Sequence, residues 1–130
     1  MTHLATCSFA DFRPEMGRPI RISLARPKYR TSIESDDRLS DLTPHPSYFR
    51  APAEEFDRRY LAQLDRVGVE RLRQRFQALD DGRPLILLCF ERHPRSGADC
   101  HRRRFAEYWE LHTGEIIPEI GGARGPEQED

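Results

Sequence analysis

The chain of 130 residues contains no apolar run near the roughly 18 residues that a membrane-spanning helix requires. Its first residues also lack the basic segment and apolar core of a secretory signal, so we expect a cytoplasmic protein with no membrane partner. Cysteine is scarce, and the three residues Cys7, Cys89 and Cys100 follow no regular spacing. This odd number argues against a secreted disulfide framework and favours reduced thiols.

An excess of positive charge is absent as well, since 21 Lys and Arg face 22 Asp and Glu. The overall charge therefore argues against a strong, non-specific nucleic-acid binder, and any anionic partner has to be met by a local group of cations. No internal repeat is present. The length and a hydrophobic fraction of 37% fit one domain, which we place at residues 1–120, followed by a flexible tail at 121–130.

Periodicity predicts short strands and longer helices in alternation. Residues 52–67 and 69–79 carry apolar side chains at helical spacing, and Gly68 separates the two helices. The continuously apolar run 85–90 is typical of a strand that is covered on both faces. The other predicted elements are strands at 4–7, 20–24 and 115–119, a helix at 100–113, and a long loop at 25–50 with one helical turn near Ser35.

Strands separated by helices indicate an α/β fold: a single three-layer domain with a small, mostly parallel sheet and helices on both faces. The apolar strand 85–90 is predicted to be its centre. In such sheets a ligand binds beyond the carboxyl ends of the strands. We therefore expect the segments 7–9, 25–28 and 90–100 to converge there, with Ser8, Arg26 and Lys28 beside the ligand. The alternative for Arg26 and Lys28 is a solvated turn.

The segment 91–104 concentrates positive charge, with five Arg and two His against two acids. Asp99 is expected to cap the following helix. Three arginines then occupy the first helical turn, where they oppose the helix dipole unless an anion or carboxylates neutralise them. A phosphate held by Arg102, with Arg95 assisting, would remove this conflict. Alternatively, the arginines point to solvent or pair with Glu91 and Glu107.

Cys100 stands at the helix start, where the dipole and nearby cations favour the thiolate. With His101 or His93 as a base it could act as a nucleophile, although an inert small residue is the competing interpretation. Cys89 is expected in the core. The four Cys and His side chains of this region match no zinc spacing, so we predict no metal and no cofactor.

The segment Leu87-Leu-Cys89-Phe-Glu91, followed by Cys100-His-Arg102, resembles the DUF488 family, which has a Leu-Cys-x-Glu strand and a Cys-His-Arg motif. Phe56-Asp-Arg-Arg-Tyr60-Leu-Ala-Gln-Leu64 is similar to the Phe-x3-Tyr-x3-Leu helix of that family, and Ile22-Ser23 with Arg26-Pro27 resembles a strand-to-loop segment of one subgroup. The segment 92–99 is longer than the usual link. The resemblance implies a single α/β domain in which Cys89, Glu91, Cys100, His101 and Arg102 carry the signature, and it implies no settled activity.

Three functions are compatible with these patterns. The first is binding of a phosphorylated, nucleotide-like ligand in a basic cleft at the strand carboxyl ends, with sequestration of that ligand as an extension. The binding residues would be Arg102, His101, Arg95, Lys28, Arg26 and Ser8. The second is a hydrolase or transferase for a nucleotide-type substrate that uses Cys100, His101 and Glu91. The third is a nucleic-acid module, whose affinity would fall steeply with salt. The sequence leaves the oligomeric state open.

Overall fold

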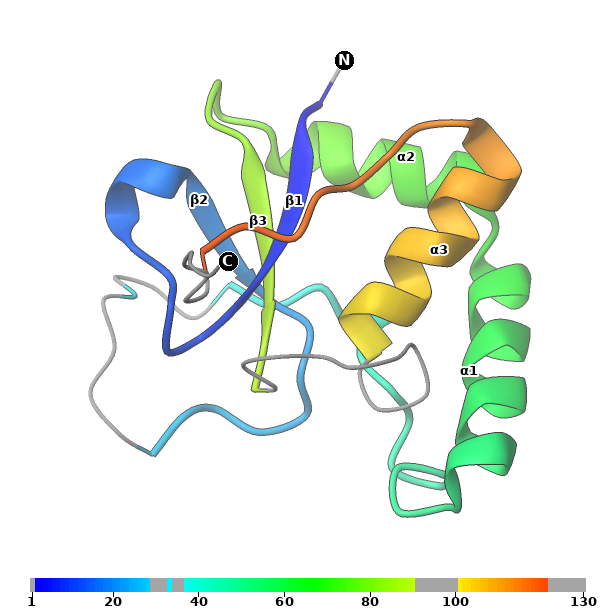
Figure 1. Cartoon of the computed structure of the whole chain (residues 1–130). Helices are drawn as coiled ribbons and strands as arrows, with labels where there is room; N and C mark the ends of the chain where they lie inside the picture. The colour runs from blue at the N-terminus through cyan, green and yellow to red at the C-terminus, as the bar shows by residue number, and fades with distance from the viewer. Residues whose placement is uncertain (1, 29–32, 34–36, 91–100, 122–130) are drawn as a thin grey trace, which may run out of the picture.

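The computed structural model describes residues 2–28, 33, 37–90 and 101–121, and Figure 1 shows their arrangement. The strands are β1 (Leu4–Ser8), β2 (Arg18–Arg21) and β3 (Leu85–Cys89). The α-helices are α1 (Ala53–Val67), α2 (Val69–Leu79) and α3 (His101–Thr113). Two short 3-10 helices, η1 (Pro14–Met16) and η2 (Ser40–Leu42), lie in the connections before and after β2.

The sheet is parallel and has β3 at its centre, in the order β1-β3-β2. Leu85 is paired with Leu4 of β1 and with Arg18 of β2. All five residues of β3 are buried, which explains why its sequence is apolar without alternation. The predicted α/β class, the parallel sheet and the central position of β3 are confirmed.

Strand β2 begins two residues before the predicted position at Ile20, because Pro19 is accommodated at the edge of the sheet. Arg18 and Ile22 donate their N–H groups to Pro84 and Leu88 on the β3 side. The nitrogen of Pro19 therefore faces away from β3, so its missing proton costs no ladder bond. Strand β2 ends at Arg21, next to the final bond from Ile22 to β3, which corrects the predicted end at residue 24.

Helices α1 and α2 match the predicted ranges. Gly68 separates them with φ +88°, a backbone conformation that glycine adopts without strain. Their buried side chains are Tyr60 and Leu64 of α1 with Leu72 and Phe76 of α2. The two helices thus form the main wall of the larger hydrophobic core.

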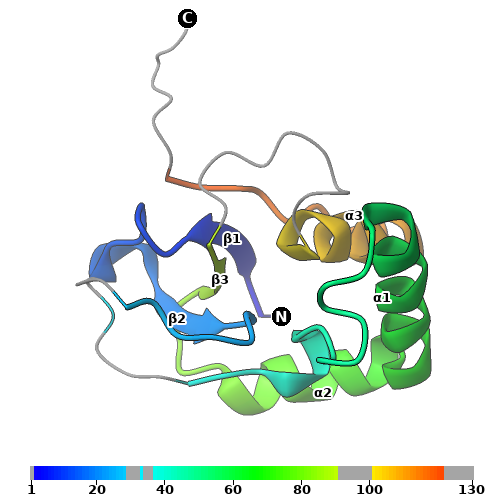
Figure 2. The same ribbon diagram turned by 90° about the horizontal axis from the view of Figure 1, so that it is seen from below.

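The three α-helices of the described residues cover the same face of the sheet (Figures 1 and 2). The opposite face, with Cys7, Ile86 and Leu88, is covered by the connection after β1 and by Ile120. The strand order accounts for this division. The connection from β1 to β2 crosses the sheet in one direction, and the connection from β2 to β3 crosses it in the other. Right-handed connections that run in opposite directions lie on opposite faces of the sheet. The step from β1 to β2 is too short for an α-helix, so η1 and its flanking loop form the second layer instead of the expected helices.

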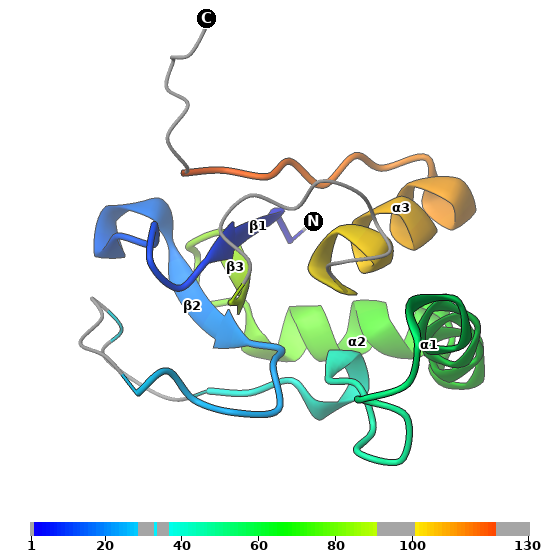
Figure 3. The same ribbon diagram turned by 60° about the horizontal axis from the view of Figure 1, so that its bottom comes forward.

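The segment after α3 returns along the free edge of β1 (Figure 3). Thr6 donates its N–H to Pro118 O at 2.9 Å and accepts from the N–H of Ile120 at 2.8 Å. The predicted strand at 115–119 is reduced to one bridge, between Thr6 and Glu119, because Pro118 can accept but cannot donate. This segment nevertheless pairs with the edge of β1.

The connection between β2 and α1 is fixed to α1 by polar side chains. Tyr60 donates its hydroxyl to Leu42 O at 2.6 Å. The amide of Gln63 donates to the carbonyl oxygens of Asp41 and Thr43, at 3.1 and 2.9 Å. The second half of the long predicted loop is therefore well packed and contains η2, whereas the helical turn predicted near Ser35 lies outside the described residues.

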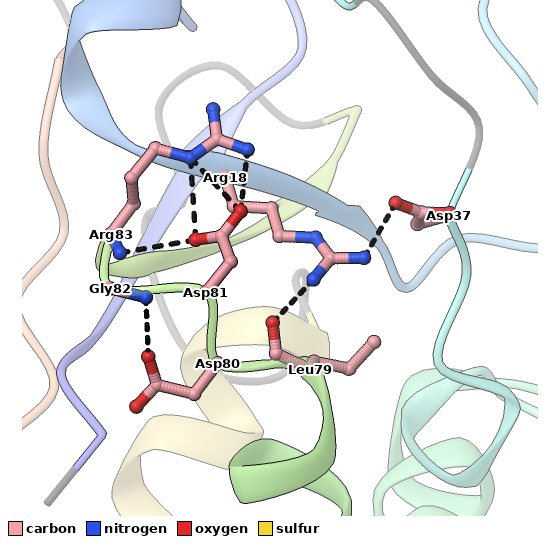
Figure 4. A network of polar contacts seen from close by, with 7 residues as sticks. All are labelled: Arg18, Asp37, Leu79, Asp80, Asp81, Gly82 and Arg83. Carbon is pink, nitrogen blue, oxygen red and sulfur yellow. Dashed lines mark hydrogen bonds and ion pairs between the residues drawn. The ribbon is translucent and has the colours of Figure 1, made fainter.

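Arg18 closes the carboxyl end of α2 (Figure 4). Its guanidinium donates to Leu79 O and to Asp37 Oδ2, the latter at 3.0 Å. A cation at this position is favourable because the last carbonyl groups of a helix carry partial negative charge. The following turn is held by Asp80, which accepts from Gly82 N–H, and by Asp81, which accepts from Arg83.

Candidate functional site

The carboxyl ends of the strands meet at one edge of the sheet, as predicted. Phe9, just beyond β1, donates its N–H to Cys89 O at 3.0 Å, and its ring lies 4.9 Å from that of Phe90. Ile22, just beyond β2, donates to Leu88 O at 3.0 Å. Helix α3 begins on the same side of the molecule (Figure 1). We call this region the carboxyl edge.

Arg102, in the first turn of α3, is the central side chain of this region. Its side chain is 0% exposed. The guanidinium donates from Nε and Nη2 to the two carboxylate oxygens of Glu119, at 3.0 and 2.7 Å. Its Nη1 lies 3.0 Å from Cys89 Sγ at the end of β3. A buried cation thus connects α3, the central strand and the C-terminal segment.

Glu119 is a site residue that the sequence analysis did not identify. Besides Arg102, it accepts a hydrogen bond of 2.7 Å from Thr6 Oγ1 of β1. Arg103 donates to the same Thr6 oxygen at 2.8 Å and to Ile117 O at 3.0 Å. The only sequence signal for Glu119 was the predicted strand at residues 115–119 on the edge of the sheet. This prediction places an acid beside another strand, but it does not indicate which cation the acid contacts.

Arg104 completes the first turn of α3 and is neutralised by acids. It donates to both carboxylate oxygens of Asp57 in α1, at 3.2 and 2.6 Å, and to Glu107 at 3.0 Å. The predicted alternative, in which Glu107 pairs with one of these arginines, is confirmed. Carboxylates from α1, α3 and the C-terminal segment therefore offset much of the unfavourable interaction with the helix dipole.

His101 connects the start of α3 with the end of β2. Its Nε2 lies 2.7 Å from Ile22 O, and because a carbonyl oxygen only accepts, Nε2 is the nitrogen that carries the proton. The ring also packs edge-on against Tyr60, with centroids 5.7 Å apart. In the neutral imidazole, Nδ1 is then the nitrogen able to accept a proton.

Ser8 and Cys7 end strand β1 and point to opposite faces of the sheet. Ser8 is buried, and its Oγ accepts from Asp11 N–H at 3.2 Å. Burial, together with the nearby carboxylates of Glu119 and Asp11, raises the pKa of the Cys7 thiol to about 11. Cys7 is therefore protonated at neutral pH. Cys89 is also buried, as predicted, and neither Cys7 nor Cys89 forms a disulfide.

The remaining predicted ligands divide into two groups. Arg26 and Lys28 are exposed in the segment that leaves the carboxyl edge after β2. Glu91, Arg95 and Cys100 lie outside the described residues, together with the predicted cap Asp99. In the part of the chain that is described, no three His, Cys, Asp or Glu side chains come together as a metal site would require.

No protein-family model, no curated protein and no solved structure matches this chain. The resemblance to the DUF488 family stays a prediction. Among the helices formed by the described residues, none combines the length and the apolar character needed to cross a membrane.

Proposed function

We propose that this chain binds a phosphorylated, nucleotide-like ligand at the carboxyl edge. The observation that supports this most directly is the buried guanidinium of Arg102, located where the central strand ends and α3 begins. A buried ion pair seldom stabilises a fold more than apolar side chains of the same volume would. Arg102 therefore calls for an explanation other than stability, and phosphate binding at a helix start supplies one.

Glu119 occupies Nε and Nη2, the pair of nitrogens with which Arg102 would bind a phosphate in a bidentate manner. Its side chain is 29% exposed, so it lies between Arg102 and solvent. In our proposal the phosphate displaces the Glu119 carboxylate. The two groups offer Arg102 acceptor oxygens in a similar geometry, but the carboxylate carries less negative charge than the phosphate. Arg26 and Lys28 attract the ligand from the exposed side, and His101 and Ser8 complete the wall.

Thermal unfolding in the presence of nucleotides, cyclic nucleotides, ADP-ribose derivatives and inorganic phosphate tests this proposal. A ligand at one hundred times its dissociation constant should add about 2.7 kcal/mol to the stability of the folded state. The informative variant is Glu119→Gln, which removes the competing charge and should increase affinity for the same ligand. Lys28→Gln should decrease it, and Arg58→Gln, which removes one charge from an exposed position of α1, is the matched control.

Three results would count against the proposal. These are the absence of any shift across the panel, equal affinity in Glu119→Gln and wild type, and equal losses of affinity in Arg58→Gln and in Lys28→Gln. The comparison of charge-matched variants separates a specific site from general electrostatic attraction, provided that ionic strength is constant.

A second candidate function is thiol-dependent catalysis on a nucleotide-type substrate, favoured by the 3.0 Å contact between Arg102 Nη1 and Cys89 Sγ. A guanidinium donating to sulfur stabilises the thiolate, which is the nucleophilic form. The predicted enzyme relied on Cys100, Glu91 and His101, so Cys89 is an additional candidate. Turnover that is lost in Cys89→Ser but retained in Cys7→Ser would support this function, whereas unchanged turnover in Cys89→Ser would reject Cys89.

A further inference from the structure

A separate pocket lies between α1 and the turn that precedes it. Its volume is about 250 Å³, which corresponds to roughly eight water molecules at ~30 Å³ each. It is lined by His45, Ser47, Tyr48, Arg59, Ala62 and Arg66. We call it the α1 pocket. It shares no residue with the carboxyl edge, and no acid is among its lining residues.

The wall of the α1 pocket is firmly held. Tyr48 is only 4% exposed and donates its hydroxyl to Gln63 Oε1. Its ring packs edge-on against Phe56 of α1, with centroids 5.4 Å apart. The amide of Gln63 is in turn bonded to two backbone carbonyls of the same connection. The polar groups at the rim are therefore presented by a pre-formed turn and a helix, which lowers the entropic cost of binding.

His45, which lines the pocket, offers it a hydrogen-bond donor. Its Nδ1 accepts from the N–H of Ser47 at 3.0 Å and lies 2.8 Å from Ser47 Oγ. Since Nδ1 accepts from a backbone amide, the neutral ring carries its proton on Nε2. The imidazole is thus held in the tautomer that presents an N–H on the side opposite to Ser47.

Two guanidinium groups supply the positive charge. Arg59 lies 3.4 Å from Ser47 Oγ and 5.2 Å from the centroid of the Tyr48 ring, and its bond to Glu55 is long, at 3.4 Å. Arg66, two turns further along α1, is exposed and forms no ion pair within the described residues. Burial raises the pKa of the Tyr48 hydroxyl, and the positive charges of Arg66 and Arg59 oppose this increase, so both cations act on the wall of the pocket.

We propose that the α1 pocket binds the phosphate group of a small phosphomonoester. Two arginines and the Nε2–H of His45 provide more donors than the two oxygens of a carboxylate can use, while Ser47 Oγ is engaged by His45 Nδ1 and Arg59 and holds both of them at the pocket. Three terminal phosphate oxygens and a charge near −2 match them better, because guanidinium binds phosphate in a bidentate manner. The Tyr48 ring closes the base of the pocket beneath Arg59.

Titration with phenyl phosphate at constant ionic strength, followed by ³¹P line broadening and by thermal unfolding, tests this assignment. Benzoate is the carboxylate probe of similar size. The key variant is Arg66→Gln, because this side chain is exposed and makes no hydrogen bond or ion pair with another described residue. It should weaken phenyl phosphate binding about tenfold or more, as expected for the loss of one charge-assisted contact. Arg58→Gln removes the same charge from the same helix outside the pocket and should bind as wild type does.

The assignment is overturned if Arg66→Gln and Arg58→Gln bind phenyl phosphate equally well, or if benzoate binds as tightly as phenyl phosphate. Ser47→Ala provides a second test, since it removes the contacts that hold His45 and Arg59 and should weaken binding without a loss of charge. Glu119→Gln, which alters the carboxyl edge, should leave this affinity unchanged. The α1 pocket and the proposed nucleotide site can therefore fail independently.

Discussion

The ion pair between Arg102 and Glu119 predicts an asymmetry between two single substitutions. Removing the acid deprives a wholly buried guanidinium of two hydrogen bonds, whereas removing the cation leaves a carboxylate that is 29% exposed. Water can reach this carboxylate, and Thr6 Oγ1 still donates to it at 2.7 Å. Glu119→Ala should therefore destabilise the fold more than Arg102→Met does.

The magnitudes follow from the burial of each partner. Loss of one partner from a buried pair typically costs ~3–5 kcal/mol, and the partial exposure of Glu119 places Glu119→Ala near about 3 kcal/mol. Methionine fills most of the volume of arginine and needs no counter-charge, so Arg102→Met should change stability by about 1 kcal/mol or less. A difference of this size is large against the ~5–15 kcal/mol of a typical domain.

Urea unfolding followed by tryptophan fluorescence measures both values, since Trp109 is the only tryptophan and is buried. Equal slopes with denaturant would show that the midpoints report stability alone. The double variant should resemble Arg102→Met, because the penalty of Glu119→Ala arises only while the guanidinium is present. An Arg102→Met variant that loses as much stability as Glu119→Ala would refute this reasoning.

Two further predictions concern the turns at the opposite end of the sheet. Hydrogen bonds from Arg83 lower the pKa of Asp81 from 3.8 to about 2, so Asp81 stabilises the fold fully above pH 4, and this contribution is lost as pH falls toward 2. Thermal unfolding between pH 5 and pH 2 should show a shallower decline for Asp81→Asn than for wild type, and parallel curves would contradict this. Gly17 and Gly82 both have positive φ, which costs ~1–3 kcal/mol for alanine, but a Cβ at Gly17 would also lie 2.4 Å from Pro84 O. The melting temperature should therefore drop more in Gly17→Ala than in Gly82→Ala. Similar drops would show that the backbone near Pro84 can shift at little energetic cost.

The elements that could be predicted from the sequence are those with strong local signals. Helices α1 and α2 have apolar side chains at helical spacing and a glycine between them, and β3 is a short apolar run. By contrast, the alternation of apolar and polar residues at 20–24 led to a wrong position for β2. This pattern does not show which edge of the strand is free of ladder bonds and can accept Pro19. The face of the sheet that each helix covers also depends on the strand order, which periodicity does not contain.

The candidate site was predictable in position but not in its charge pairing. Parallel strands imply a common carboxyl edge, and the sequence correctly placed His101, Arg102 and Ser8 there. The partner of Arg102 could not be predicted, because 22 acids compete and nothing local distinguishes Glu119. Its proximity depends on the return of the C-terminal segment along β1, a contact between residues more than one hundred positions apart in the chain.

The central position of β3 has a consequence for synthesis on the ribosome. Strands β1 and β2 pair with β3 and not with each other, so the sheet cannot begin to form until residues 85–89 have left the exit tunnel. At ~5–20 residues per second, β1 then waits several seconds for its partner. During this interval the available contacts are local ones, between α1 and α2 and between α1 and the connection that precedes it. A nascent chain that stops before Leu85 should therefore be helical but without a sheet, and its unpaired strands would be targets for chaperones.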